Sequence, residues 1–140
     1  MNRSKKIRKL KRYKKGPGFV ALSWDVLNSK AFQKMTASSR ALLPYFLGKP
    51  KRHFKDSEYC DAEFTFTGGE AKRYGFSKGT FSRSKDQIIS HGFVDPVVKG
   101  GLRGHAKTAS KFRLSRRWED FGTEDFVQIE WETFIPDRSI

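Results

Sequence analysis

The chain has 140 residues, 36% of them hydrophobic, and a single cysteine, Cys60. This composition supports one modest core in a single domain with tails. It excludes an intramolecular disulfide framework, a cysteine-rich zinc site and, for want of a run of about eighteen apolar residues, a membrane span. The formal net charge of +14 favours a polyanionic partner, because clustered Lys and Arg side chains displace counterions from phosphates.

The two ends of the chain carry opposite charges. Residues 1–15 contain nine basic and no acidic side chains, whereas residues 116–140 have a net charge of −4. Repulsion between like charges predicts that the first segment is disordered in isolation, serving either as a solubilising tail or as an arm along a phosphate backbone. No apolar stretch follows it as in a secretory signal, so we expect a cytoplasmic protein.

Three segments are expected along the chain. A basic arm with a Gly-Pro linker occupies residues 1–18, because the sequence Gly16-Pro17-Gly18 is typical of a boundary. The folded domain spans residues 19–116. Residues 117–140 form an acidic, aromatic extension that folds back on the domain.

The first half of the domain is predicted to be helical. Ser23 and Ser29 are N-cap candidates for two short helical turns, and Thr36 caps a longer helix that runs through Leu47. Pro44 lies inside the apolar stripe of that helix and is expected to kink or shorten it.

A strand and two helices follow. Residues 63–67 alternate polar and aromatic side chains, which predicts a short strand with one buried face. A second helix is expected from Gly68 or Gly69 to Tyr74, a turn at Gly75, and a third helix over residues 77–91. The inward face of the third helix is predicted to be formed by Phe81, Ser84, Ile88 and Ile89.

The sequence then predicts a hairpin. Residues 93–98 and 111–115 form its strands, and Pro96 places the first at a sheet edge because proline cannot donate to a ladder. Residues 99–107 between them form a basic, glycine-rich loop. The expected fold class is therefore α+β.

This order of elements, together with two motifs, resembles the winged helix-turn-helix superfamily. The resemblance implies a three-helix core, a small antiparallel sheet and a β-hairpin wing, with the third helix as the recognition helix. More narrowly, residues 19–126 resemble uncharacterised helix-turn-helix proteins of bacterial genomes and mobile elements. In such helices position 85 is usually apolar, and Lys85 is expected to extend its stem to solvent. The motifs are Phe76-Ser77-Lys78-Gly79-Thr80-Phe81-Ser82-Arg83 and Gly92-Phe93-Val94.

A helix that enters the major groove contacts bases with its first two turns. Arg83 is expected to grip a guanine edge or to touch only a phosphate, and Thr80 to contact DNA or to serve in packing or capping. The second helix is expected to face the backbone, and the wing a phosphate or the minor groove. The predicted DNA-binding residues are Lys72, Arg73, Ser77, Lys78, Thr80, Ser82, Arg83, Arg103, His105 and Lys107.

Catalytic patterns are missing from the sequence. The acidic cluster of Asp56, Glu58, Asp61 and Glu63 lies near Cys60, but no histidine or metal-loop glycine accompanies it. We expect it to neutralise nearby basic residues. No phosphate-binding loop or catalytic triad can be identified, so we expect neither an enzyme nor a cofactor.

The sequence thus predicts a duplex DNA-binding protein, either a transcriptional regulator or a replication or maintenance factor of a mobile element. Two alternatives stay open. One is RNA binding, which the basic arm and the many aromatic residues also suit. The other is a protein-interaction module on a winged-helix scaffold, because fold does not fix function. The target sequence and the oligomeric state stay open as well.

Overall fold

The computed structural model describes residues 18–50, 59–103 and 106–135, and over residues 101–108 it describes the backbone alone. The expected arm over residues 1–15, most of its linker, and Asp56 and Glu58 of the acidic cluster lie outside the described residues. Over the described ranges, no helix is both long enough and apolar enough to span a bilayer.

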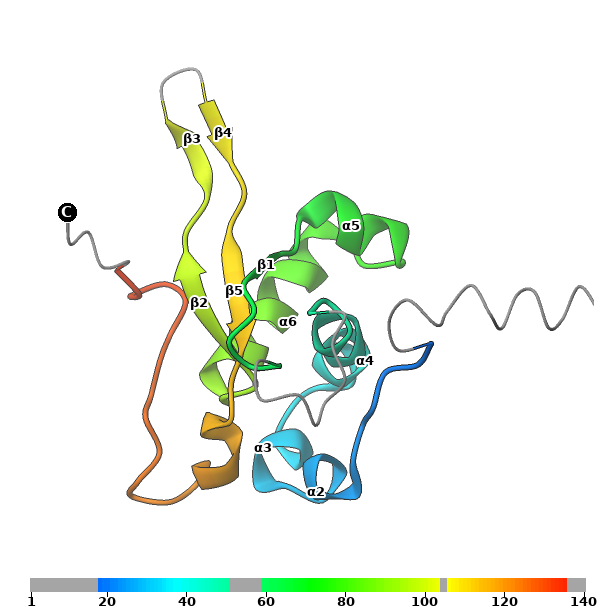
Figure 1. Ribbon diagram of the computed structural model, residues 1–140, viewed down its shortest axis with the longest axis vertical. Coiled ribbons are helices and arrows are strands. Elements are labelled where there is room, and N and C mark those ends of the chain that lie inside the picture. The colour runs from blue at the N-terminus through cyan, green and yellow to red at the C-terminus, as the bar shows by residue number, and fades with distance from the viewer. Residues whose placement is uncertain (1–17, 51–58, 104–105, 136–140) are drawn as a thin grey trace, which may run out of the picture.

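The described chain is an α+β structure in which helices precede a three-stranded antiparallel sheet (Figure 1). In chain order the elements are α2 (Trp24–Leu27), α3 (Lys30–Gln33), α4 (Ala37–Leu47), β1 (Phe64–Thr65), α5 (Gly68–Arg73), α6 (Lys78–Ser90), β2 (Val94–Val98), β3 (Gly101–Arg103), β4 (Ala106–Thr108), β5 (Lys111–Leu114) and the 3₁₀ helix η2 (Arg117–Asp120).

Side-chain caps start the first three helices where the sequence predicts them. The hydroxyl of Ser23 accepts from the N–H of Val26, and that of Ser29 from the N–H of Phe32. Thr36 caps α4, which continues through Pro44 to Leu47. The expected shortening at Pro44 is therefore wrong. A single lost hydrogen bond near the last turn is offset by burial of the leucine and phenylalanine side chains of this helix.

The sheet has the strand order β1-β5-β2. Phe64 pairs with Phe112, and Val94 pairs with Leu114. Among the described strands β2 pairs only with β5, so the prediction that Pro96 lies on an edge strand is confirmed. The register of the β2–β5 pair shifts between Pro96 and Val98.

The segment expected to be a plain loop contains a second, two-stranded sheet. Strands β3 and β4 pair antiparallel, with Gly101 opposite Thr108 and Arg103 opposite Ala106. A ladder needs only backbone groups, so glycine-rich chain can extend the hairpin beyond the packed sheet. Figure 1 shows this ribbon projecting from the end of β2 and β5.

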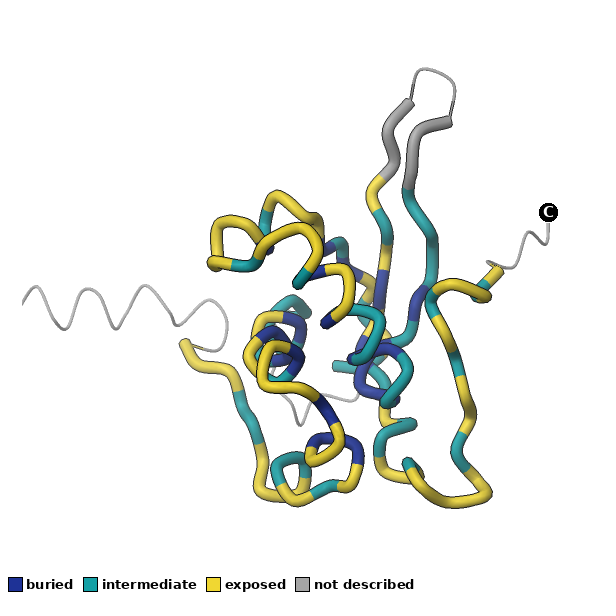
Figure 2. The backbone as a smooth tube through the Cα atoms, turned by 180° about the vertical axis from the view of Figure 1, so that it is seen from behind, coloured by how far each residue is buried: buried dark blue, intermediate teal, exposed yellow. Residues whose placement is uncertain are grey.

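The core lies between α4, α6 and one face of the sheet, as the buried segments in Figure 2 show. Phe46 is its centre. The ring of Phe46 stacks on Phe66, with centroids 4.5 Å apart, and meets the edges of Phe64 and Phe112 at 6.1 and 5.6 Å. The predicted inward face of α6 is confirmed, since Phe81, Ser84, Ile88 and Ile89 are all buried.

Two neighbouring arginines, at the end of the domain and the start of the C-terminal extension, differ sharply in their surroundings. The guanidinium of Arg117 donates to Asp95 at 2.6 Å and to the carbonyl oxygens of Ile89, Val94 and Val127 at 2.7, 3.1 and 2.9 Å. Its side chain is 11% exposed, whereas that of Arg116 is 77% exposed and pairs with Glu119 on the surface. Arg117 therefore joins the end of α6, strand β2 and the extension.

The extension packs on the domain as expected. The ring of Trp118 stacks on Phe93 at 5.6 Å, and the backbone N–H of Trp118 donates to the carbonyl oxygen of Gly92 at 3.0 Å. Gly92 has φ +93°, and a Cβ at this position would lie 2.5 Å from the backbone nitrogen of Trp118. Only glycine therefore fits where α6 turns into β2.

Gly92→Ala is expected to lower the free energy of unfolding by about 2 to 4 kcal/mol, because the methyl group meets backbone and the conformation is strained. Gly75→Ala is the control. Gly75 has φ +94° but open space around it. Gly75→Ala is therefore expected to lower the free energy of unfolding by about 1 kcal/mol, through backbone strain alone. Urea unfolding of both variants measures the difference, and equal losses would contradict a close approach at Gly92.

Arg117→Ala is expected to cost about 3 kcal/mol of folding free energy, because it leaves Asp95 without its partner and frees three carbonyl oxygens. Arg116→Ala removes the same side chain one position earlier and should change the urea midpoint little. The same midpoint for both variants would show that the Arg117 contacts do not stabilise the fold.

Candidate nucleic-acid interface

Helices α5 and α6 are joined by a tight turn over residues 74–77. Gly75 adopts φ +94°, and the N–H of Phe76 donates to the carbonyl oxygen of Ala71 at 2.9 Å. Phe76 is half-buried against the core. The turn predicted at Gly75 and Phe76 is confirmed, and it fixes the angle at which α6 leaves α5.

The hydroxyl groups of Ser77 and Thr80 are used in the cap of α6. Ser77 Oγ accepts from the N–H of Thr80 at 3.2 Å and donates to Thr80 Oγ1 at 2.9 Å. Thr80 is half-buried and Ser77 exposed. The capping role considered for Thr80 is therefore present, while its contact with DNA stays a prediction.

The other predicted residues of these two helices have exposed side chains. Lys72 and Arg73 occupy the last turn of α5, and Lys78, Ser82 and Arg83 lie in the first two turns of α6. The two helices pack against each other. The fold thus brings four of the predicted cationic side chains and one hydroxyl to one helix pair.

Arg83 folds back along α6 toward the start of the helix. Its Nη1 atom lies 3.2 Å from the position that a Cβ on Gly79 would occupy. Gly79 therefore leaves room for the guanidinium beside the exposed first turn.

The backbone of β3 and β4 places two predicted wing residues. Arg103 pairs with Ala106, and Lys107 pairs with Leu102; His105 lies outside the described residues. Figure 1 shows the ribbon extending past the three-stranded sheet toward the end of the molecule where α5 lies.

Lys85 does not reach solvent, contrary to the expectation. Its side chain is 12% exposed, and its ammonium group lies 4.1 Å from the ring centroid of Trp131 and 3.6 Å from Asp86 Oδ1. Burial lowers the pKa of Lys85 and raises that of Asp86. The cause of the difference is the C-terminal strap, residues 127–135, which sequence periodicity within α6 cannot reveal.

The C-terminal strap spans from α6 to the root of the hairpin. The ring of Trp131 lies 5.6 Å from Phe112 and 5.3 Å from the ammonium group of Lys99, which donates to the carbonyl oxygen of Glu132. Trp131 thus contacts a lysine on each side, Lys85 on α6 and Lys99 after β2. The aromatic, acidic composition of the extension was the only signal of this contact in the sequence.

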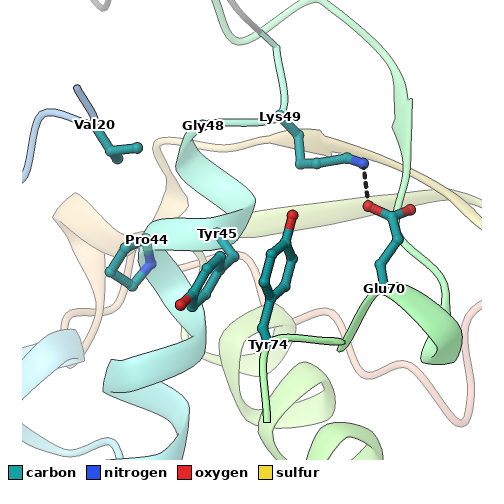
Figure 3. A pocket seen from close by; sticks show the side chains of 7 residues that line it. All are labelled: Val20, Pro44, Tyr45, Gly48, Lys49, Glu70 and Tyr74. Atoms are coloured by element: carbon teal, nitrogen blue, oxygen red, sulfur yellow. Dashed lines mark hydrogen bonds and ion pairs between the residues drawn. The ribbon is translucent and has the colours of Figure 1, made fainter. Parts of the chain in front are cut away.

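An open groove lies between α4 and α5 and was not predicted from the sequence (Figure 3). Its volume is about 420 Å³, and exposed Tyr45 and Tyr74 form one wall of it. Lys49 and Glu70 form an ion pair at its other side, 2.6 Å long. The sequence held one indication of this groove: Tyr45 falls outside the buried stripe of α4, and Tyr74 follows the last residue of α5.

Gly79→Ala is expected to raise the free energy of unfolding by up to about 1 kcal/mol, because alanine favours helix and the end of Arg83 can shift. Gly69→Ala is the matched control, since Gly69 holds the same second position in α5 and has no arginine over it. Thermal unfolding measures both. If Gly69→Ala raises the free energy of unfolding and Gly79→Ala lowers it, Arg83 is instead fixed in place.

Over the residues whose placement is described, no group of three or more His, Cys, Asp or Glu side chains is arranged to hold a metal ion. Burial raises the pKa of the half-buried Cys60 thiol, which disfavours the reactive thiolate. Comparison of the chain with protein-family models, with curated proteins and with solved structures finds no match.

Proposed function

We propose that this protein is a winged helix-turn-helix protein that binds duplex DNA, with α6 in the major groove and the β3–β4 ribbon as the wing. The observation that carries the proposal is the exposed basic surface on the first two turns of α6 and the last turn of α5. Lys78 and Arg83 supply charge there, and Lys72 and Arg73 flank them. First-turn residues are those that a recognition helix presents to base edges.

The strand order supports the same proposal. A winged helix-turn-helix domain places a strand between its first two helices and pairs it with the strand that returns from the wing. Here β1 lies between α4 and α5 and pairs with β5, which returns from the ribbon. The hairpin then lies beside the helix pair that carries the basic surface.

Electrostatics makes duplex DNA a fitting partner for this surface. The exposed cations of α5 and α6 lie near the N-terminus of a thirteen-residue helix, whose backbone dipole also attracts anions. Phosphate contacts of this kind fix the position of a protein on DNA, and we expect Arg83 to contact either a guanine edge or a phosphate. A regulator or a replication factor would use the same surface.

The test is a salt titration of binding of a labelled mixed-sequence duplex to the full chain. Wild-type protein should bind with a Kd of roughly 10⁻⁴ to 10⁻⁶ M at physiological salt. Lys78→Ala combined with Arg83→Ala should weaken binding. The double variant should also reduce the slope of log K against log salt by about one if only Lys78 binds a phosphate, and by about two if Arg83 does so as well, because each lost phosphate contact removes about 0.9.

Lys30→Ala combined with Lys34→Ala is the control, since both lysines are exposed and lie at the start and the C-cap of α3, at the other end of the molecule (Figure 1). This pair removes the same charge and should leave the slope almost unchanged. An equal loss in both double variants would indicate diffuse charge instead of an interface. Stronger binding to a matched hairpin RNA would contradict duplex DNA as the partner.

A further inference from the structure

The groove between α4 and α5 presents two tyrosine rings to solvent. The rings of Tyr45 and Tyr74 are stacked with centroids 4.1 Å apart and planes 19° apart, and the residues are 39% and 45% exposed. Phe76 meets Tyr45 edge-on at 6.1 Å and supports it from the core side. A stacked aromatic pair at a groove offers a flat π surface at little cost in conformational entropy.

Opposite the tyrosines, the groove holds a fixed donor and a fixed acceptor. Lys49 Nζ lies 2.6 Å from Glu70 Oε2, and both side chains are mostly buried, at 24% and 17% exposed. The other oxygen of Glu70 accepts from the N–H of Thr67, which caps α5. The polar pair is therefore held in place by the helix cap before any ligand arrives.

The charge beside the groove indicates the class of ligand. Lys72 and Arg73 are exposed on α5, directly before Tyr74. A flat aromatic surface next to two cations matches a ring that is carried on a phosphate backbone. Single-stranded nucleic acid has this chemistry, because its bases are free to stack and its phosphates bind lysine and arginine. Paired bases in a duplex have no free face for such a site.

We propose that this groove binds an unpaired nucleobase of a single-stranded segment. The base stacks against the Tyr45–Tyr74 pair, its polar edge meets Lys49 and Glu70, and its flanking phosphates lie by Lys72 and Arg73. This second site adjoins the duplex surface on α6 through the shared helix α5. The protein is thereby suited to nucleic acid in which a duplex continues into a single strand.

The experiment measures the fluorescence of 2-aminopurine in the middle of an oligothymidylate strand on titration with the full chain. This base analogue loses emission when it stacks, whereas contact with phosphates alone leaves it bright. Wild-type protein should quench it. Tyr74→Ala should abolish most of the quenching and weaken binding about 5- to 150-fold, which corresponds to the loss of one base–aromatic stack. Tyr74→Phe keeps the ring and should quench as wild type does.

Three outcomes overturn the proposal. They are no quenching by wild-type protein, equal quenching by Tyr74→Ala, and equal loss in the alanine and phenylalanine variants. Thermal unfolding of each variant identifies a loss caused by misfolding, and Tyr45→Ala with Tyr45→Phe repeats the test from the second helix. The double variant of Lys78 and Arg83 separates this site from the proposed function, since it should lose duplex affinity and still quench 2-aminopurine.

Discussion

The arrangement of the domain depends on the guanidinium of Arg117. Its hydrogen bonds reach the last turn of α6, strand β2 and the start of the C-terminal strap, so one planar group sets the distances among three segments. The contact between Gly92 and Trp118 lies beside it and leaves no room for a side chain. Together they fix how α6 meets the sheet. This junction thereby fixes the position of the exposed N-terminal turns of α6 relative to the ribbon that extends from β2 and β5.

Local features of the fold could be predicted from the sequence, and long-range contacts could not. Caps by Ser23, Ser29 and Thr36 need only a hydroxyl three residues before an N–H group, and the buried face of α6 follows from a repeat of 3.6 residues. The burial of Lys85 depends on Trp131, forty-six positions away, and no periodicity relates the two. The β3–β4 ribbon escaped prediction because each of its strands has only three residues, too few to show the alternation by which strands are recognised.

The candidate site also has one part that the sequence predicted and one part that it did not. The cations of α5 and α6 were identified because they follow a helix-turn-helix pattern, and both helices begin and end close to their predicted positions. The tyrosine groove was not identified, because Tyr45 comes from α4 and Tyr74 from the end of α5, and only the packed structure stacks the two rings. Helix α5 joins the two surfaces. Its cap holds Glu70 for the groove, while its last turn presents Lys72 and Arg73 between them. Under the two proposals taken together, a duplex on α6 and a single strand in the groove would meet at this short helix.

The position of Arg117 along the chain has a consequence for folding during synthesis. Helices α2 to α6 leave the ribosome before β5, which supplies the central strand of the sheet, and before the guanidinium that secures it. Until then the apolar faces of α4 and α6, and the rings of Phe64 and Phe66 between these helices in the chain, have no completed sheet to pack against. A nascent chain in this state exposes aromatic surface of the kind that chaperones bind. Folding of this domain is therefore expected to finish in one late, cooperative step, when residues 111–127 have emerged.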